Sequence, residues 1–142
     1  MKIGIANDHR GLSLKEKIVD YLHNSNYSCV DFGTNSSESV DYVDYAVKLC
    51  NEIISGNINK GILICGTGIG MSIAANKIKG IRCARVCTKE EASLASEHNM
   101  ANVIAVGENT TDIENIVEAF LTTKHSNDER HIRRVNKIMN LE

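Results

Sequence analysis

The sequence predicts an α/β fold, in which a single open parallel five-stranded sheet has helices on both faces and is followed by a C-terminal helix. Short apolar segments alternate with segments of helical periodicity along the whole chain. The apolar segments are continuous, as in strands that are buried on both faces. The 142 residues are enough for one domain with its own core, and no linker or repeat divides them, so we expect residues 1–142 to form a single domain.

The expected strands are short and mostly end at a glycine or a polar turn. They cover residues 2–6, 28–32, 61–65, 81–87 and 103–106. The expected helices lie between and after them, over about 14–22, 43–54, 70–78, 88–99, 111–121 and 128–140. Two helices begin with a capping box, Thr88 to Glu91 and Thr111 to Glu114. The last helix has an expected apolar side formed by Ile132, Val135, Ile138 and Met139. This order of elements predicts a Rossmann-like arrangement.

Composition excludes several classes of protein. Sixteen Lys and Arg against eighteen Asp and Glu give a net charge of −2, so no positive field exists to hold nucleic acid or an anionic membrane. The longest apolar runs are about five residues, against the ~20 that span a bilayer. The five cysteines form no CxxC motif, which argues against a metal site and a disulfide framework. With no secretory signal pattern at MKIGIA, we expect a cytoplasmic protein with free thiols.

Ligands of open parallel sheets bind beyond the carboxyl ends of the strands, and two turns there have unusual residues. Asp8 and His9 follow the first strand, and the third strand runs into the glycine loop Gly66–Gly70, GTGIG. Glycine at every second position lets backbone N–H groups approach an anion. A dinucleotide site is disfavoured because Met71 replaces the third glycine of its fingerprint, and no GK[ST] follows for a Walker loop. The alternative that the loop is only a tight turn into a helix, without a ligand, remains open.

Individual side chains also have alternative interpretations. Cys65 ends a buried strand, where a cysteine is usually a core residue, but it also precedes a helix N-terminus, which favours a reactive thiolate. His98 ends the fourth helix, where a histidine interacts favourably with the helix dipole. Arg130 and Arg134 lie one helical turn apart, an arrangement that suits a phosphate or an ordinary solvated face.

Several short motifs occur in an order that is typical of a known family. The residues in question are Asp8-His9, Asp41-Tyr42, CGTGIGMSIAANK over 65–77, Gly80-Ile-Arg82, Glu97-His-Asn99, Ala101-Asn-Val103 and Arg130-His131 with Arg134. Over essentially all 142 residues the chain resembles ribose-5-phosphate isomerase type B, within the family that includes the galactose-6-phosphate isomerase subunits. His98-Asn99 favours the ribose enzyme. The resemblance implies interconversion of D-ribose 5-phosphate and D-ribulose 5-phosphate in the pentose phosphate pathway, without metal or cofactor.

The resemblance also implies a role for each residue. Cys65 would be the base that moves a proton between C1 and C2. His98 would open the furanose ring, and Asp8 would handle the hydroxyl protons. The enediolate oxygens would be held by Gly66, Thr67, Gly68, Ile69 and Gly70, with Thr67 adding its hydroxyl. The sugar would be positioned by Tyr42 and Asn99, and the phosphate bound by His9, Arg130 and Arg134.

Two positions depart from the family. Asn109, preceded by Glu108, stands where an arginine commonly helps to bind phosphate, and Arg85 stands where the family is usually apolar. A neutral amide does not replace that charge, so phosphate affinity is reduced or supplied differently. Two alternatives therefore stay open: an isomerase of a six-carbon sugar phosphate, such as allose or galactose 6-phosphate, and a non-catalytic sugar-phosphate-binding protein.

The order of the elements has a consequence for the oligomer. Cys65 ends the third strand, whereas His98 ends a helix that leads into the fifth, so the two lie at opposite edges of the sheet. Five strand residues at ~3.3 Å each put about 17 Å between those edges. We therefore expect a homodimer with active sites shared between subunits, which leaves open whether dimers pair into tetramers.

Overall fold

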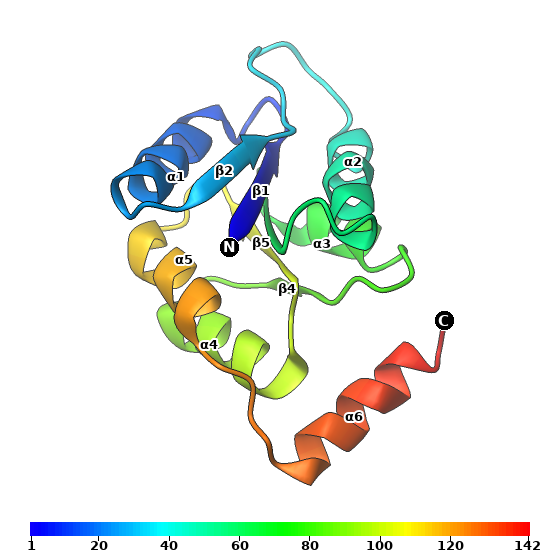
Figure 1. Ribbon diagram of the computed structural model, residues 1–142. Coiled ribbons are helices and arrows are strands. Elements are labelled where there is room, and N and C mark those ends of the chain that lie inside the picture. Colours follow the sequence, from blue (N-terminus) through cyan, green and yellow to red (C-terminus); the bar gives the residue numbers. More distant parts are fainter.

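The computed structural model describes all 142 residues, and Figure 1 shows a central sheet with helices on either side of it. The five strands are β1 (Lys2–Asn7), β2 (Ser28–Asp31), β3 (Lys60–Cys65), β4 (Cys83–Arg85) and β5 (Val103–Gly107). The six helices are α1 (Leu12–Asn24), α2 (Tyr42–Ile54), α3 (Ile69–Ala75), α4 (Lys89–Asn99), α5 (Ile113–Thr122) and α6 (Glu129–Met139). The predicted number, type and order of the elements are all confirmed.

Every strand pair is parallel, and the order across the sheet is β2-β1-β3-β5-β4. The central strands β1, β3 and β5 have apolar side chains on both faces because both faces are covered. Nineteen buried residues, including Ile18 and Phe120, pack between the sheet and α1, α4 and α5. Twelve others, including Leu49 and Met71, pack between the sheet and α2 and α3. The fold is the predicted open sheet with helices on both faces.

Two expected boundaries are wrong at the fourth strand and the helix before it. Strand β4 covers only Cys83–Arg85 of the expected 81–87, because it lies at the edge of the sheet and pairs with β5 alone. Helix α3 ends at Ala75 rather than near Ile78, and the chain turns where the Asn76 side chain bonds the backbone of Cys83. The edge position therefore accounts for the short strand, and the Asn76 bonds mark the turn after the helix.

One of the two predicted capping boxes forms. The Glu91 N–H donates to Thr88 Oγ1 at 3.2 Å, and the Glu91 carboxylate accepts from the Cys87 N–H at 2.6 Å. Thr111 makes no such bond: α5 begins after Asp112, whose φ of 55° lies in the left-handed region. The Asp112 carboxylate accepts instead from the side-chain amide of Asn115.

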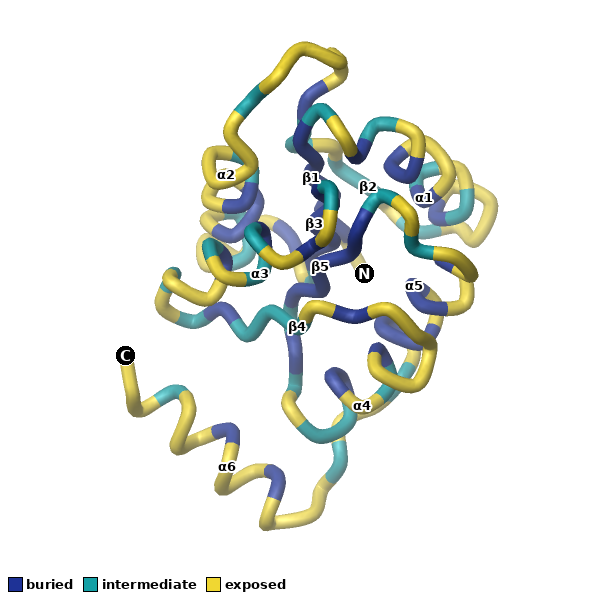
Figure 2. The backbone as a smooth tube through the Cα atoms, turned by 180° about the vertical axis from the view of Figure 1, so that it is seen from behind, coloured by how far each residue is buried: buried dark blue, intermediate teal, exposed yellow.

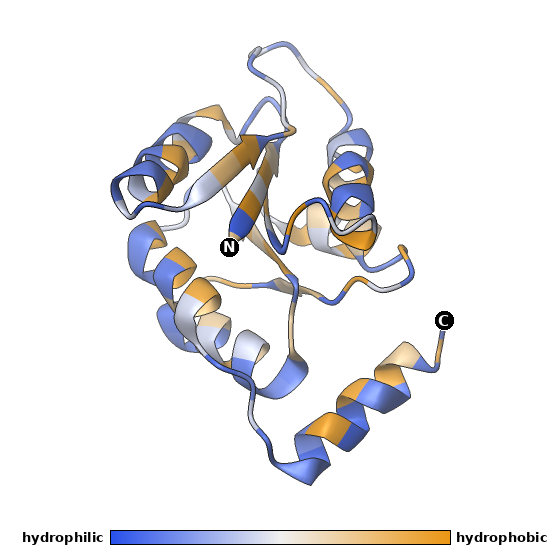
Figure 3. Ribbon diagram, in the orientation of Figure 1, coloured by the Kyte–Doolittle hydropathy of each residue, from blue (hydrophilic) through white to orange (hydrophobic).

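Helix α6 projects away from the sheet, and most of its residues are exposed (Figure 1 and Figure 2). It contacts α4. Only His131 and Val135 of this helix are buried. The expected apolar side is therefore partly wrong for the single chain, because Ile132 and Ile138 are exposed. Figure 3 shows these apolar positions recurring along the helix. None of the helices is long and apolar enough to cross a membrane.

Candidate functional site

The candidate site lies where the direction of strand addition reverses. Strand β1 has β2 on one side and β3 on the other, so the carboxyl ends of β1 and β3 flank a switch point of the topology, where open α/β sheets bind ligands. Asp8 follows β1 and is buried, and its N–H donates to the carbonyl of Ile64 at 3.1 Å. That bond places Asp8 beside Cys65, the last residue of β3.

The glycine loop directs its backbone toward the Cys65 sulfur. Gly68 has φ +76°, and a Cβ there would lie 2.8 Å from the carbonyl carbon of Val106, so only glycine fits. In this conformation the Gly68 N–H donates to Cys65 Sγ at 3.1 Å. The next amide, of Ile69, donates to Thr67 Oγ1 at 3.2 Å. An N–H directed at sulfur stabilises negative charge on it.

Cys65 is the only cysteine of the chain whose sulfur accepts a hydrogen bond. Burial raises the pKa of Cys50 to about 12 and, with a smaller contribution from Asp31, that of Cys29 to about 11. Burial also raises the pKa of Cys83. These three thiols stay protonated at neutral pH, and all three pack in or against the hydrophobic core. Cys65 is only 4% exposed and packs in the cluster beneath α2 and α3, yet its sulfur accepts a backbone hydrogen bond.

Tyr42 lies against the glycine loop, although 23 residues separate it from Cys65 in the sequence. Added to Gly70, a Cβ would lie 2.5 Å from Cζ of the Tyr42 ring. The close contact therefore depends on the missing side chain at Gly70. It brings the first residue of α2 to the beginning of α3, beside the glycine loop.

His9 is fixed by the long segment between β2 and α2. Its Nδ1 accepts the Val40 N–H at 3.2 Å. With Nδ1 as acceptor, the neutral ring has its proton on Nε2, which makes that nitrogen a hydrogen-bond donor. A donor of this kind suits an anionic ligand oxygen.

Arg10 belongs to this group, although no sequence motif singles it out. Its N–H donates to Asp8 Oδ1 at 3.0 Å, and its guanidinium lies over Gly66 and pairs with Glu108. The hydrogen bond with Glu108, together with the charge of that carboxylate, raises the pKa of the Arg10 guanidinium. Arg10 and Glu108 closely follow the ends of β1 and β5, which lie at the same edge of the sheet. Those positions are the sequence signal that could have identified the pair.

The remaining predicted residues form a second group at the opposite edge of the sheet. Register pairs Gly61 with Val103 and Cys65 with Gly107, so four residues, about 13 Å of strand, separate the end of β3 from the start of β5. His98 precedes β5, and its ring stacks on that of His131 with centroids 4.0 Å apart. Burial, followed by the nearby His98, lowers the pKa of His131. The stacked rings join α4 to α6, which also bears Arg130 and Arg134.

The predicted site residues therefore divide into two groups within one chain. Near Cys65 lie Asp8, His9, Tyr42, Gly66, Thr67, Gly68, Ile69, Gly70 and Asn109. At the opposite edge lie His98, Asn99, Arg130 and Arg134. No group of three or more His, Cys, Asp or Glu side chains is placed to hold a metal ion.

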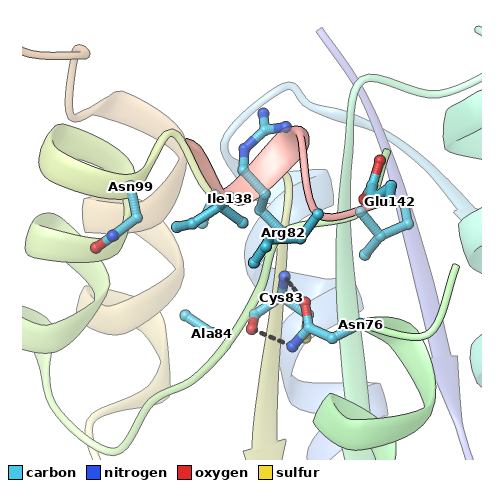
Figure 4. A pocket seen from close by; sticks show the side chains of 10 residues that line it. Asn76, Arg82, Cys83, Ala84, Asn99, Ile138 and Glu142 are labelled. Carbon is cyan, nitrogen blue, oxygen red and sulfur yellow. Dashed lines mark hydrogen bonds between the residues drawn. The ribbon is translucent and has the colours of Figure 1, made fainter. Parts of the chain in front are cut away.

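A cavity of about 420 Å³ adjoins the second group (Figure 4). It lies between the start of β4, the end of α4 and the C-terminal residues Ile138 to Glu142. Asn76 closes one side through two 2.8 Å hydrogen bonds with the backbone of Cys83, and Arg82 donates to the carbonyl of Met100. Asn99 lines this cavity, which is remote from Cys65.

Comparisons with known proteins identify the family of this chain. The family described as Ribose/Galactose Isomerase matches residues 3–138. Ribose-5-phosphate isomerase B of Escherichia coli is 42% identical over 145 residues, covering 99% of this chain and 96% of that protein. A solved ribose-5-phosphate isomerase B of Clostridium thermocellum superposes with a TM-score of 0.94 at 44% identity, covering 99% and 97% of the two chains.

A structure of the Mycoplasma genitalium ribose-5-phosphate isomerase B holds bound ribulose-5-phosphate. It has a TM-score of 0.92 and 36% identity to this chain, covering 99% of it and 95% of that chain. Sequence and fold thus agree over nearly the full length of each protein. The chain belongs to the ribose/galactose isomerase family.

Proposed function

We propose that this protein is an aldose–ketose isomerase that interconverts D-ribose 5-phosphate and D-ribulose 5-phosphate. One observation is central to the proposal: Cys65 lies at the switch point of the sheet with its sulfur accepting the Gly68 N–H at 3.1 Å. A thiolate held by a backbone donor, beside a glycine loop and a buried carboxyl, is the arrangement that proton abstraction next to a carbonyl needs.

In this mechanism the Cys65 thiolate takes the proton from C2 of the open-chain aldose. The electron pair of the broken C–H bond forms the C1–C2 double bond of an enediolate, whose oxygens interact with the glycine loop and the Thr67 hydroxyl. The thiol then returns the proton to C1, and Asp8 moves the proton between the two hydroxyl oxygens. A preorganised donor at such an oxyanion lowers the activation free energy by about 2.7–4 kcal/mol.

Ring opening uses the second group, and binding of the sugar and its phosphate uses residues of both groups. His98 donates a proton to the ring oxygen as a general acid, and the furanose ring opens. Tyr42 and Asn99 position the sugar, and His9, Arg130 and Arg134 bind the phosphate. Since the two groups lie at opposite sheet edges, His98, Asn99, Arg130 and Arg134 come from a partner subunit in a homodimer, whether or not dimers pair further.

Exposed apolar side chains support the dimer. Ile132 and Ile138 on α6 face solvent, as do Val43 and Val47 on α2 and Ile73 on α3. The α2 and α3 residues flank the glycine loop, and those on α6 accompany Arg130 and Arg134. A two-fold arrangement that places α6 of one subunit near the loop of the other buries both sets together.

A coupled assay tests the proposed function with ribose 5-phosphate, allose 6-phosphate and galactose 6-phosphate as substrates. We expect turnover of ribose 5-phosphate by the wild type and a loss of about 10²-fold or more in kcat for Cys65→Ala, the scale of a missing general base. Cys29→Ala, at the far edge of the sheet, is the matched control and retains activity. Unchanged turnover in Cys65→Ala contradicts the mechanism, and faster turnover of a six-carbon substrate contradicts the substrate assignment.

A further inference from the structure

A second cavity, of about 330 Å³, opens beside the glycine loop on the side away from β1. Its polar lining comes from three neighbouring strand ends. Thr67 belongs to the loop after β3, Arg85 ends β4, and Asn109, Thr110 and Thr111 follow β5. Because β5 lies between β3 and β4, these residues meet at the carboxyl edge of the sheet, the same edge as Cys65.

Arg85 is held in this cavity by the loop itself. Its Nε donates to the backbone carbonyl of Thr67 at 3.2 Å. The rest of the guanidinium is free to bind elsewhere, because no carboxylate lies within 4.0 Å of it. Arg10, the other arginine at this edge, is instead neutralised by Glu108. Arg85 is thus a cation with unused charge on the Cys65 side of the site.

The surroundings of Arg85 suit a phosphate group. A guanidinium forms charge-assisted hydrogen bonds with phosphate oxygens, often two at a time. Hydroxyls of Thr67, Thr110 and Thr111 and the amide of Asn109 supply neutral donors around the same space. No acidic side chain lines the cavity.

We propose that Arg85 binds the phosphate group of the sugar phosphate from the same subunit that provides Cys65. The inference rests on the proposed function and adds one substrate-binding residue to it. Thr67 belongs both to the glycine loop and to the lining of the cavity, so a sugar whose C1 and C2 lie at Cys65 extends past Thr67 toward Arg85. Arg85 therefore orients the substrate without touching the reacting carbons.

Steady-state kinetics of Arg85→Gln test this assignment. A lost charge-assisted contact corresponds to about a tenfold or larger rise in KM for ribose 5-phosphate. We expect kcat to change by less than about twofold, because the lost contact is equally present in ground and transition states. The competitive inhibition constant of inorganic phosphate rises by a similar factor. Lys17→Gln, which removes one exposed positive charge on α1, is the control and leaves both constants unchanged.

A second variant separates loss of charge from loss of structure. Asn109 lines the same cavity, so Arg85→Gln combined with Asn109→Arg returns a guanidinium to it and is expected to recover most of the KM. An unchanged KM in Arg85→Gln overturns the proposal, and so does an equal rise in Lys17→Gln.

Direct binding keeps this inference distinct from the proposed function. If the wild type fails to isomerise ribose 5-phosphate, the proposed function fails, and calorimetric titration of wild type and Arg85→Gln with inorganic phosphate still decides the role of Arg85. Weaker binding by Arg85→Gln supports the role. Equal binding by the two proteins, or none by the wild type, overturns it.

Discussion

Gly68 has a backbone conformation that requires glycine, and its N–H donates to the Cys65 sulfur. Its φ of +76° and the 2.8 Å approach to Val106 both exclude a side chain. Gly56 has nearly the same φ, +74°, but no atom lies within 4 Å of a Cβ added there. Gly56→Ala thus measures conformational strain alone, about 1 kcal/mol, whereas Gly68→Ala adds the contact with the Val106 backbone and is expected to cost about 1–3 kcal/mol more.

Chemical denaturation of the two variants measures that difference. Activity of Gly68→Ala is expected to fall further than its stability explains, since the N–H that donates to the Cys65 sulfur moves with the loop. Equal destabilisation by the two substitutions would contradict the close contact at Gly68. Each variant changes one hydrogen to a methyl group, so the pair is chemically matched.

Sequence alone predicted part of the site at the residue scale. Asp8 and the glycine loop could be placed at one edge because parallel strands end together. The contact of Tyr42 with Gly70 could not be derived from the pattern, because it depends on how α2 crosses over α3. The sequence did not explain Arg85, because its bond to Thr67 depends on the order of the strands in the sheet, in which β5 lies between β3 and β4.

At the scale of elements, the two predicted capping boxes provide an internal comparison. Thr88 accepts the Glu91 N–H, whereas Thr111 makes no cap bond with α5. Thr88→Ala is therefore expected to lower the free energy of unfolding by about 1 kcal/mol and Thr111→Ala by less than about 0.5 kcal/mol. Thermal and urea unfolding of the two variants check this, and equal losses would contradict the assignment of the caps.

The sequence pattern was the same at both helices, so its failure at Thr111 has a structural cause. Asp112 takes up a left-handed conformation directly before α5, which moves Thr111 out of the capping position. For α6, periodicity correctly identified the helix, but only Val135 of its expected apolar side is buried, and burial of Ile132 and Ile138 depends on a surface that a single chain does not provide. Local patterns identify elements, and their surroundings come from the tertiary arrangement.

For the molecule as a whole, the division of site residues into two groups predicts complementation between inactive variants. In a mixed dimer of Cys65→Ala and His98→Ala subunits, one site lacks both groups and the other is intact. With random subunit exchange, half of the dimers are mixed, so about a quarter of the wild-type activity is expected to return.

Refolding the two variants together and assaying against each refolded alone provides the measurement. Light scattering on the same samples reports the oligomeric state. A mixture that stays as inactive as its components, or a wild type active as a monomer, would contradict the shared site.

The stacking of His98 on His131 has a consequence for folding. His131 lies on α6, 33 positions after His98, so the two rings meet only when α6 packs against α4. Detachment of α6 thus leaves the sheet and the thiol in place, while the imidazole of α4 loses its stacking neighbour. On this view, a chain becomes competent only once α6 has docked and a second copy has been met.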